Sequence, residues 1–121
     1  MRCLSFLLTV LLLSATLAQA VPAIRPAPPN ASDADIMETI EEYLRATVYD
    51  PDTYEPLGWS PLVLFEEDES KAYKWGMRHT YRVGHPTYGV LFVDRIFFIA
   101  YDGQVESVIE YTTRPCIDCK W

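Results

Sequence analysis

Two groups of residues in this chain have side chains that could do chemistry. The first is His79, Asp94 and Tyr111, which fall in one row across three predicted strands. A carboxylate beside a histidine can hold the tautomer of the ring and raise its pKa. A catalytic triad also needs a nucleophile, and no suitably placed serine or cysteine accompanies these residues. We therefore expect a satisfied polar row near the end of a sheet, with no catalytic residue.

The second group is the cysteine pair of Cys116-Ile117-Asp118-Cys119. In redox enzymes a Cys-x-x-Cys motif opens a helix, and this sequence continues only with Lys120 and Trp121. A zinc site needs two more ligands, and distant histidines make weak candidates. We expect a local disulfide between Cys116 and Cys119, with two free thiols as the alternative, and no metal or cofactor.

Three segments have the patterns of strands that could position the polar row. Apolar and polar residues alternate strictly over residues 73–83, which predicts a half-buried strand. Residues 90–101 are apolar on both faces, and Asp102-Gly103 then predicts a hairpin turn into a return strand over residues 105–111. An earlier strand is predicted over residues 59–65.

The hairpin turn predicts the strand register. Around Asp102-Gly103, Ile96 should face Ile109, Arg95 should face Glu110, and Asp94 should face Tyr111. The loop over residues 84–89 is less constraining. If Val83 faces Val90 across that loop, then His79 faces Asp94 and Met77 faces Ile96. A one-residue slip would exchange the two faces of the sheet.

This register predicts which face of the sheet receives a helix. The expected core face consists of Tyr73, Trp75, Met77, Tyr81, Phe92, Ile96, Phe98, Val105 and Ile109. The opposite face would carry Leu91, Val93, Phe97, Ile99 and Val108 among charged residues. A terminal tail could cover that second face, or a partner could bind there.

A helix is predicted over residues 33–49, where Ile36, Ile40 and Leu44 recur at helical spacing. Ser32 is the expected N-cap. Pro51 should end the helix at Asp50, so the proline-rich, acidic residues 50–60 read as a joint between helix and sheet. The fold class is then α+β, with one N-terminal helix packed on a four-stranded antiparallel meander.

Residues 1–20 have the parts of a secretory signal peptide: Arg2, a leucine-rich stretch and Ala18-Gln19-Ala20 as cleavage site. The apolar stretch is shorter than the ~20 residues of a membrane-spanning helix, which disfavours an uncleaved anchor. We expect cleavage after Ala20, a secreted or periplasmic protein, and no membrane span in the mature chain.

The remaining chain divides into three parts. Residues 21–31 contain four prolines and no hydrophobic period, which predicts a polyproline-like spacer with little fixed structure. Residues 32–115 should form a single α+β domain, and residues 116–121 a Cys-x-x-Cys tail. The net charge of −7 argues against nucleic acid as a partner.

The order of these segments resembles a group of small exported bacterial proteins. In those proteins a helix precedes a "DPDS-aromatic" or "DPDSA" turn, which Asp50-Pro51-Asp52-Thr53-Tyr54 matches here. They continue with an asparagine-rich, double-glycine segment, which Gly84-His85-Pro86-Thr87-Tyr88-Gly89 replaces in this chain. The resemblance covers residues of about 36–110. It implies a helix-on-sheet fold of the cystatin-like kind and no activity, because proteins of this kind are largely uncharacterised.

Two functional hypotheses follow. The first is a non-enzymatic exported module that binds a protein, a peptide or a second copy of itself through a sheet face or edge. The second is a metal, redox or hydrolytic protein that uses His79, Asp94 and the Cys116/Cys119 pair. Protease inhibition, by analogy with cystatins, lacks an inhibitory loop motif and rests on fold analogy alone.

Overall fold

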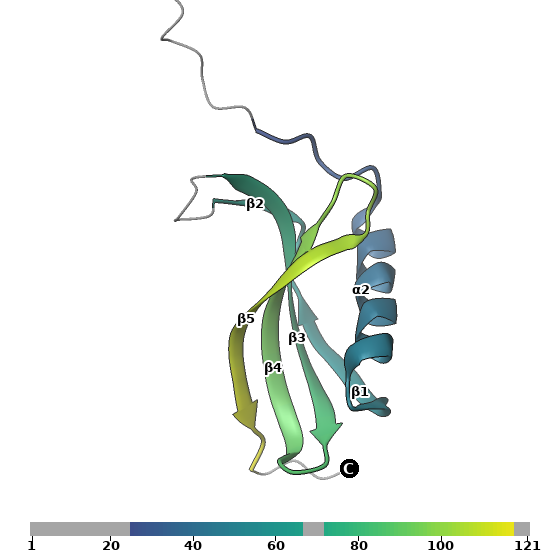
Figure 1. Ribbon diagram of the computed structural model, residues 1–121, viewed down its shortest axis with the longest axis vertical. Helices are drawn as coiled ribbons and strands as arrows, with labels where there is room; N and C mark the ends of the chain where they lie inside the picture. The colour runs from purple at the N-terminus through teal and green to yellow at the C-terminus, as the bar shows by residue number, and fades with distance from the viewer. Residues whose placement is uncertain (1–24, 67–71, 118–121) are drawn as a thin grey trace, which may run out of the picture.

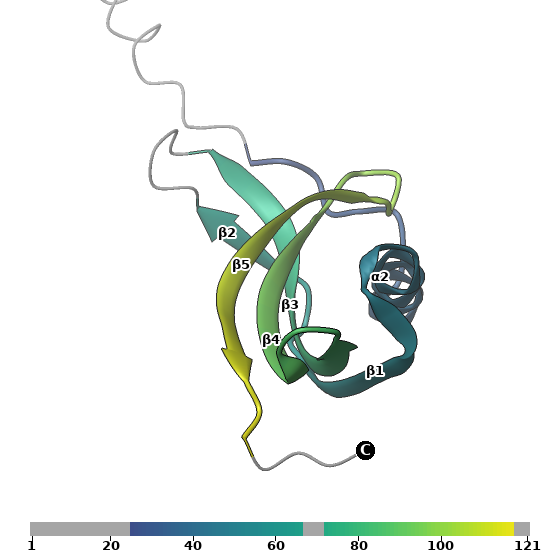
Figure 2. The same ribbon diagram turned by 60° about the horizontal axis from the view of Figure 1, so that its bottom comes forward.

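The computed structural model describes residues 25–66 and 72–117. Its elements are α2 (Asp33–Thr47), β1 (Asp50–Trp59), β2 (Val63–Glu66), β3 (Tyr73–His85), β4 (Gly89–Ile99) and β5 (Val105–Pro115). The strands form one antiparallel sheet in the order β1-β3-β4-β5, with β2 also paired to β3. The sheet curves, and α2 lies on its concave side (Figures 1 and 2). The α+β class is confirmed, with five strands in place of four.

The helix forms where its apolar stripe predicts it. The Oγ atom of Ser32 accepts a hydrogen bond from the backbone N–H of Asp35 at 3.2 Å, so Ser32 is the N-cap. Ile36, Ile40 and Leu44 are fully buried. The helix ends at Thr47, earlier than the predicted Asp50, because Val48 is already extended and leads directly into β1.

The proline-rich stretch after the helix is a strand, so the prediction that it serves only as a joint is wrong. β1 pairs with β3 from Asp50 to Trp59, with two irregularities in register. Prolines are tolerated at an edge strand and at bulges, and β1 supplies both. β2 then pairs with the other end of β3 along the same edge. The predicted first strand over residues 59–65 is therefore divided, which raises the strand number from four to five.

The register around the Asp102-Gly103 turn agrees with the prediction in its central part. Arg95 faces Glu110, Ile96 faces Ile109, and Phe97 faces Val108. A bulge on each side shifts the remaining pairs. One bulge makes Tyr111 an extra residue of β5, so Asp94 faces Thr112 and not Tyr111.

The predicted register between β3 and β4 is wrong by one residue. Val83 faces Leu91, and His79 faces Arg95. The cause is the loop, which has only three residues, 86–88, between the paired residues His85 and Gly89. Gly89 has a φ of 73°, the left-handed conformation that closes three-residue hairpin loops. An odd loop length changes the alternation of β4 relative to β3.

This register exchanges the two faces of β4. The residues packed with α2 in the core are Met77, Tyr81, Val83, Val93, Phe97 and Ile99, with Leu91, Val105 and Val108 packed against them. The predicted interaction face, Leu91, Val93, Phe97, Ile99 and Val108, therefore lies under the helix, and that assignment is wrong. Phe92, Ile96, Phe98 and Ile109, predicted for the core, lie on the face turned away from α2, which we call the open face.

The proline-rich segment before the helix packs on the end of the sheet. The indole N–H of Trp75 donates to the carbonyl of Pro26 at 3.0 Å, and the N–H of Asn30 donates to the carbonyl of Tyr101 at 3.0 Å. Pro29 is buried. The expectation of little fixed structure is therefore wrong for residues 25–31.

Several predictions made for the termini fall on parts of the chain outside the described residues. These are the signal peptide of residues 1–20 and the pairing partner Cys119. Among the described residues there is no helix with the length and apolar character that a membrane span requires.

Substitutions at two glycines test the role of the loop that sets the register between β3 and β4. A Cβ atom at Gly89 or at Gly58 would meet no atom within 4 Å, but only Gly89 has a positive φ. We expect Gly89→Ala to lower the free energy of unfolding by about 1 kcal/mol, because an L-residue is strained in the left-handed region. Gly58→Ala, the matched control, should change it by less than about 0.5 kcal/mol. Urea unfolding measures both, and equal effects would contradict this account of the loop.

Candidate functional site

The sheet divides the predicted polar row between its two faces. His79 faces the helix side and is fully buried, while Asp94 lies on the open face. Tyr111 contacts Asp94's partner Arg78, with its ring centroid 4.6 Å from the guanidinium carbon. Asp94 and Tyr111 thus both contact Arg78, although they do not face each other, and His79 does not belong to this cluster. The one-residue correction in register is the reason.

His79 is enclosed by side chains of β1, β3 and β4, and β1 supplies its stacking partner and both of its hydrogen-bond partners. Its ring stacks on Trp59 at 3.4 Å between centroids, and Tyr81 lies 5.2 Å away. Nδ1 lies 2.7 Å from the carbonyl oxygen of Gly58, and Nε2 lies 2.6 Å from the hydroxyl of Tyr54. A carbonyl oxygen can only accept, so Nδ1 carries the proton and Nε2 accepts from Tyr54.

Burial keeps the imidazole neutral. Burial lowers the pKa of His79 to about 4, although the bond to Gly58 acts in the opposite direction. Burial also raises the pKa of Tyr54, which keeps its hydroxyl protonated as a donor. Both ring nitrogens are occupied and the ring has no exposed surface. The geometry makes His79 a satisfied core residue that ties β1 to β3, and gives it no route to a substrate.

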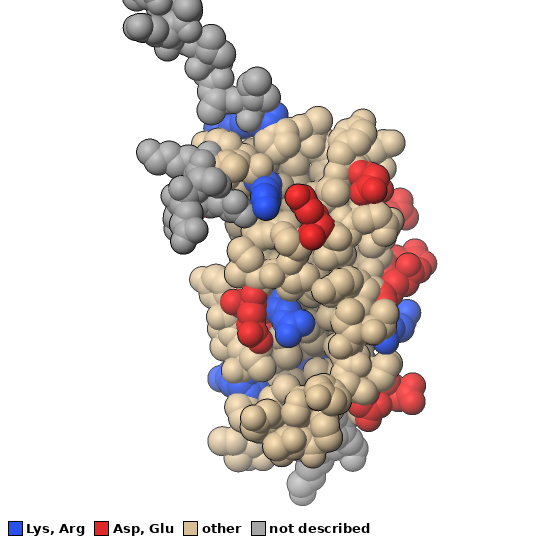
Figure 3. Space-filling view, in the orientation of Figure 1, with Lys and Arg blue, Asp and Glu red and all other residues tan. Residues whose placement is uncertain are grey.

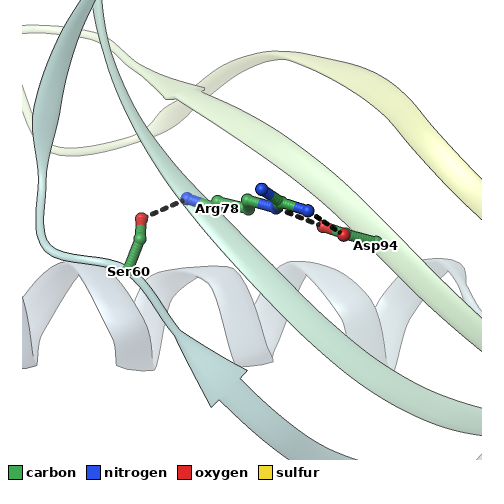
Figure 4. A network of polar contacts seen from close by, with 3 residues as sticks. All are labelled: Ser60, Arg78 and Asp94. Carbon is green, nitrogen blue, oxygen red and sulfur yellow. Dashed lines mark hydrogen bonds and ion pairs between the residues drawn. The ribbon is translucent and has the colours of Figure 1, made fainter.

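The open face has a cluster of its own, shown in Figure 4. The guanidinium of Arg78 on β3 donates to both carboxylate oxygens of Asp94 on β4, at 2.9 Å from Nε and 2.5 Å from Nη2. Ser60, just after β1, accepts from the backbone N–H of Arg78 at 2.8 Å and donates its own N–H to the Arg78 carbonyl at 2.8 Å. Together with Tyr111, the cluster joins three neighbouring strands and the segment that follows β1.

The cluster is suited to holding charges in place. The hydrogen bonds from Arg78 lower the pKa of Asp94, so this carboxylate stays ionised near neutral pH. A general base works best with a pKa near the working pH, and this one is moved away from it. A bidentate arginine–carboxylate pair instead fixes both groups with defined geometry.

A groove runs beside this cluster on the open face. It has a volume of about 370 Å³ and is lined by Leu57, Thr80, Phe92, Val93, Asp94, Thr112 and Arg114. Leu57, Ile109 and Tyr111 expose 47%, 46% and 62% of their surface. Of these three, Leu57 lines the groove, which combines apolar and polar side chains as surfaces that bind another molecule do.

The two long edge strands of the sheet, β1 and β5, carry features that disfavour pairing with another strand. Pro51 and Pro56 lie in β1 on one edge, and the register of β1 shifts twice. On the other edge, β5 has the bulge at Tyr111 and ends at Pro115. Prolines and bulges are the usual means by which edge strands avoid pairing. These features disfavour β1 and β5 as binding edges, and the face predicted for binding lies under α2, so the open face is considered in its place.

Cys116, the described member of the cysteine pair, lies far from His79. The N–H of Cys116 donates to the carbonyl of Val90, whereas His79 faces Arg95, five residues further along β4 or about 16 Å at the rise of a strand. Residues 25–66 and 72–117 contain no group of three or more His, Cys, Asp or Glu side chains that could hold a metal ion. The disulfide itself stays a prediction, because Cys119 is outside these residues.

Sequence reasoning missed Arg78 and Ser60. The signal for Arg78 was present in the strict alternation of residues 73–83, which put it on the face opposite Met77 and Tyr81. With the three-residue loop recognised, Arg78 and Asp94 would have fallen on one face as diagonal neighbours. Ser60 had no comparable signal. Its two hydrogen bonds to the backbone of Arg78 depend on where β1 ends, which the sequence does not indicate.

The buried histidine makes stability depend on pH. The folded pKa of about 4 lies below the ordinary value of ~6.5, so protonation favours the unfolded chain. The contribution of His79 is fully present above pH ~6.5 and is lost as the pH falls toward 4, by about 3 kcal/mol in total. Two-dimensional NMR of the two histidine rings should show one midpoint near 4, which His79→Gln removes and His85→Gln leaves. A midpoint near 6.5 for His79 would contradict the buried, neutral ring.

Comparisons with known proteins add no family to this description. No family model, no curated protein and no solved structure matches the chain. The resemblance to small exported bacterial proteins therefore stays a prediction, and function has to be argued from the geometry.

Proposed function

We propose that the protein is a non-enzymatic, exported interaction module that binds an acidic segment of a partner protein on its open face. The observation that carries this proposal is the separation of charge between the two sides of the molecule. Lys74, Arg78, Arg82 and Arg114 contact open-face residues of the sheet, against the carboxylates of Glu55 and Asp94. The protein as a whole carries a net charge of −7, so this cationic face stands out.

The helix side has the opposite character. Asp33, Asp35, Glu38 and Glu42 are exposed on α2, and acidic side chains gather along that side of the molecule in Figure 3. An acidic partner would be repelled there and attracted to the open face, which fixes its approach. Charge of this kind contributes orientation and association rate more than affinity.

Apolar contacts supply the rest of the surface. The guanidinium of Arg114 lies 5.4 Å from the ring centroid of Phe92, and the ammonium of Lys74 lies 5.7 Å from that of Phe98. Phe98 is buried, so it is the pair of Arg114 and the half-buried Phe92 that presents charge and apolar surface side by side. Such a surface suits a segment in which acidic residues alternate with tyrosine or leucine.

The absence of catalysis and the export are parts of the same proposal. The only histidine-carboxylate cluster that the sequence suggested is divided between the two faces, and Asp94 is committed to Arg78. Export rests on the signal-peptide pattern of residues 1–20, which Ala18-Gln19-Ala20 ends. The metal, redox or hydrolytic alternative has no described cluster in its favour.

A charge reversal at the groove tests the surface. The probe is a fluorescein-labelled peptide of twelve residues in which glutamate alternates with tyrosine and leucine. We expect Arg114→Glu, in a chain of residues 21–121, to weaken binding of this peptide by roughly three- to tenfold at low salt, since one or two exposed charge contacts are lost. Fluorescence anisotropy measures the affinity, and added salt should reduce the difference.

Arg45→Glu is the matched control, because it makes the same change of charge on the exposed side of α2. It should leave the affinity within about twofold of the original chain. Equal losses in the two variants would show that net charge matters and the open face does not. No binding of the acidic peptide, or equal binding of a peptide with lysine in place of glutamate, would overturn the proposal.

A further inference from the structure

A second binding surface lies at the other end of β3, away from the groove of the open face. There the proline-rich segment that precedes α2 crosses the end of the sheet (Figures 1 and 2). The indole N–H of Trp75 donates to the carbonyl of Pro26 at 3.0 Å. The guanidinium of Arg25 lies 5.1 Å from the ring centroid of Tyr73. Two aromatic side chains of one strand thus contact two consecutive residues of the segment.

The sequence of the segment favours one backbone conformation. Pro26, Pro28 and Pro29 have φ fixed near −65°, and a residue that precedes a proline is driven to extended geometry. Their spacing is Pro-x-x-Pro, with Arg25 in front. A polyproline II segment has no internal hydrogen bonds, so its carbonyls are open to donors. Trp75 supplies both a donor and a flat apolar ring.

The remaining contacts give the segment a defined place. Pro29 is buried, and Asn30 is bonded to Tyr101 at the β4–β5 turn. A cavity of about 330 Å³ adjoins the segment and is lined by Pro26, Ala27, Tyr73, Trp75, Ile99 and Tyr101, among others. Aromatic-lined grooves that accept proline-rich segments are a recurring mode of peptide recognition. The end of β3 has the parts of such a groove.

We propose that Tyr73, Trp75 and Tyr101 form a binding site for arginine-bearing, proline-rich segments of a partner protein, which residues 25–29 of the same chain occupy as a built-in ligand. The tether is short, because Ser32 already caps α2. Effective concentrations of a tethered ligand are about millimolar for short links. A partner segment therefore competes with residues 25–29. It displaces them only when its concentration or its affinity is high enough to exceed the effective concentration of the tethered segment.

The experiment weakens the binding of residues 25–29 within the chain and adds a peptide of the same sequence as a free ligand. The protein is the chain of residues 21–121 with Pro26→Gly and Pro28→Gly, which removes the fixed φ angles and leaves the helix cap in place. The probe is a fluorescein-labelled peptide with the sequence of residues 23–30, AIRPAPPN. We expect the released chain to bind it at least about tenfold more tightly than the unaltered chain, because the competitor is weakened.

Three comparisons separate specific recognition from nonspecific binding. Trp75→Phe in the released chain keeps an apolar ring but loses the N–H donor, and should lower the affinity severalfold. Trp59→Phe, which changes the tryptophan stacked on His79, should leave the affinity unchanged. A peptide with alanine at each proline should bind more weakly than the original peptide. Circular dichroism confirms that each variant is folded.

Three outcomes would overturn the proposal. The released chain binds the peptide no better than the unaltered chain, the alanine peptide binds equally well, or Trp75→Phe and Trp59→Phe have the same effect. A dimer of the unaltered chain that dissociates on Pro26→Gly/Pro28→Gly would show that a second copy holds the segment, which overturns the assignment within one chain. None of these results bears on the acidic-peptide test, since that test probes Arg114 on the open face.

Discussion

The pairing of β3 with β4 is the constraint on which the rest of the structure depends. Its register is set by a three-residue loop closed by Gly89 in the left-handed conformation. Because side chains alternate along a strand with a period of two, this one loop decides which residues of both strands face α2. It places Phe97 beneath the helix and Asp94 on the open face. The open face proposed for binding follows from that placement.

The buried histidine joins β3 to its other neighbour, β1. His79 enters the core only because β1 satisfies both ring nitrogens, through Gly58 and Tyr54, and supplies Trp59 as a stacking partner. An imidazole without those partners would cost free energy in the core. The irregular sequence of β1, with its prolines and register shifts, is thus fixed against β3 in part by this one buried polar group. The edge strand and the core residue stabilise each other.

Short-range sequence signals predicted the short-range structure. The predictions failed where the pairing of two distant segments determines the structure. The Ser32 cap and the apolar stripe of α2 were readable because a helix is defined by residues a few positions apart. The Asp102-Gly103 turn predicted the central pairs of β4 and β5, since a short turn fixes register directly. The loop at residues 86–88 has no such dipeptide, so its length was misjudged and the faces of β4 were exchanged. The open-face cluster followed that error, because Arg78 meets Asp94 only in the observed register.

The two proposed binding surfaces use β3 in different ways, and the curvature of the sheet explains why one strand can serve both. In the middle of β3 the helix covers one face, so the exposed face carries Arg78 and its ion pair. Toward the start of β3 the strand extends past the buried residues of α2, and Tyr73 and Trp75 are left half-buried. Apolar rings in that position need a cover, and the proline-rich segment supplies one without competing for backbone hydrogen bonds, because prolines have no N–H to satisfy. A cover held by one indole hydrogen bond, a ring contact and a buried proline is strong enough to be ordered. It also rests on few enough contacts that a partner segment of the same chemistry can replace it.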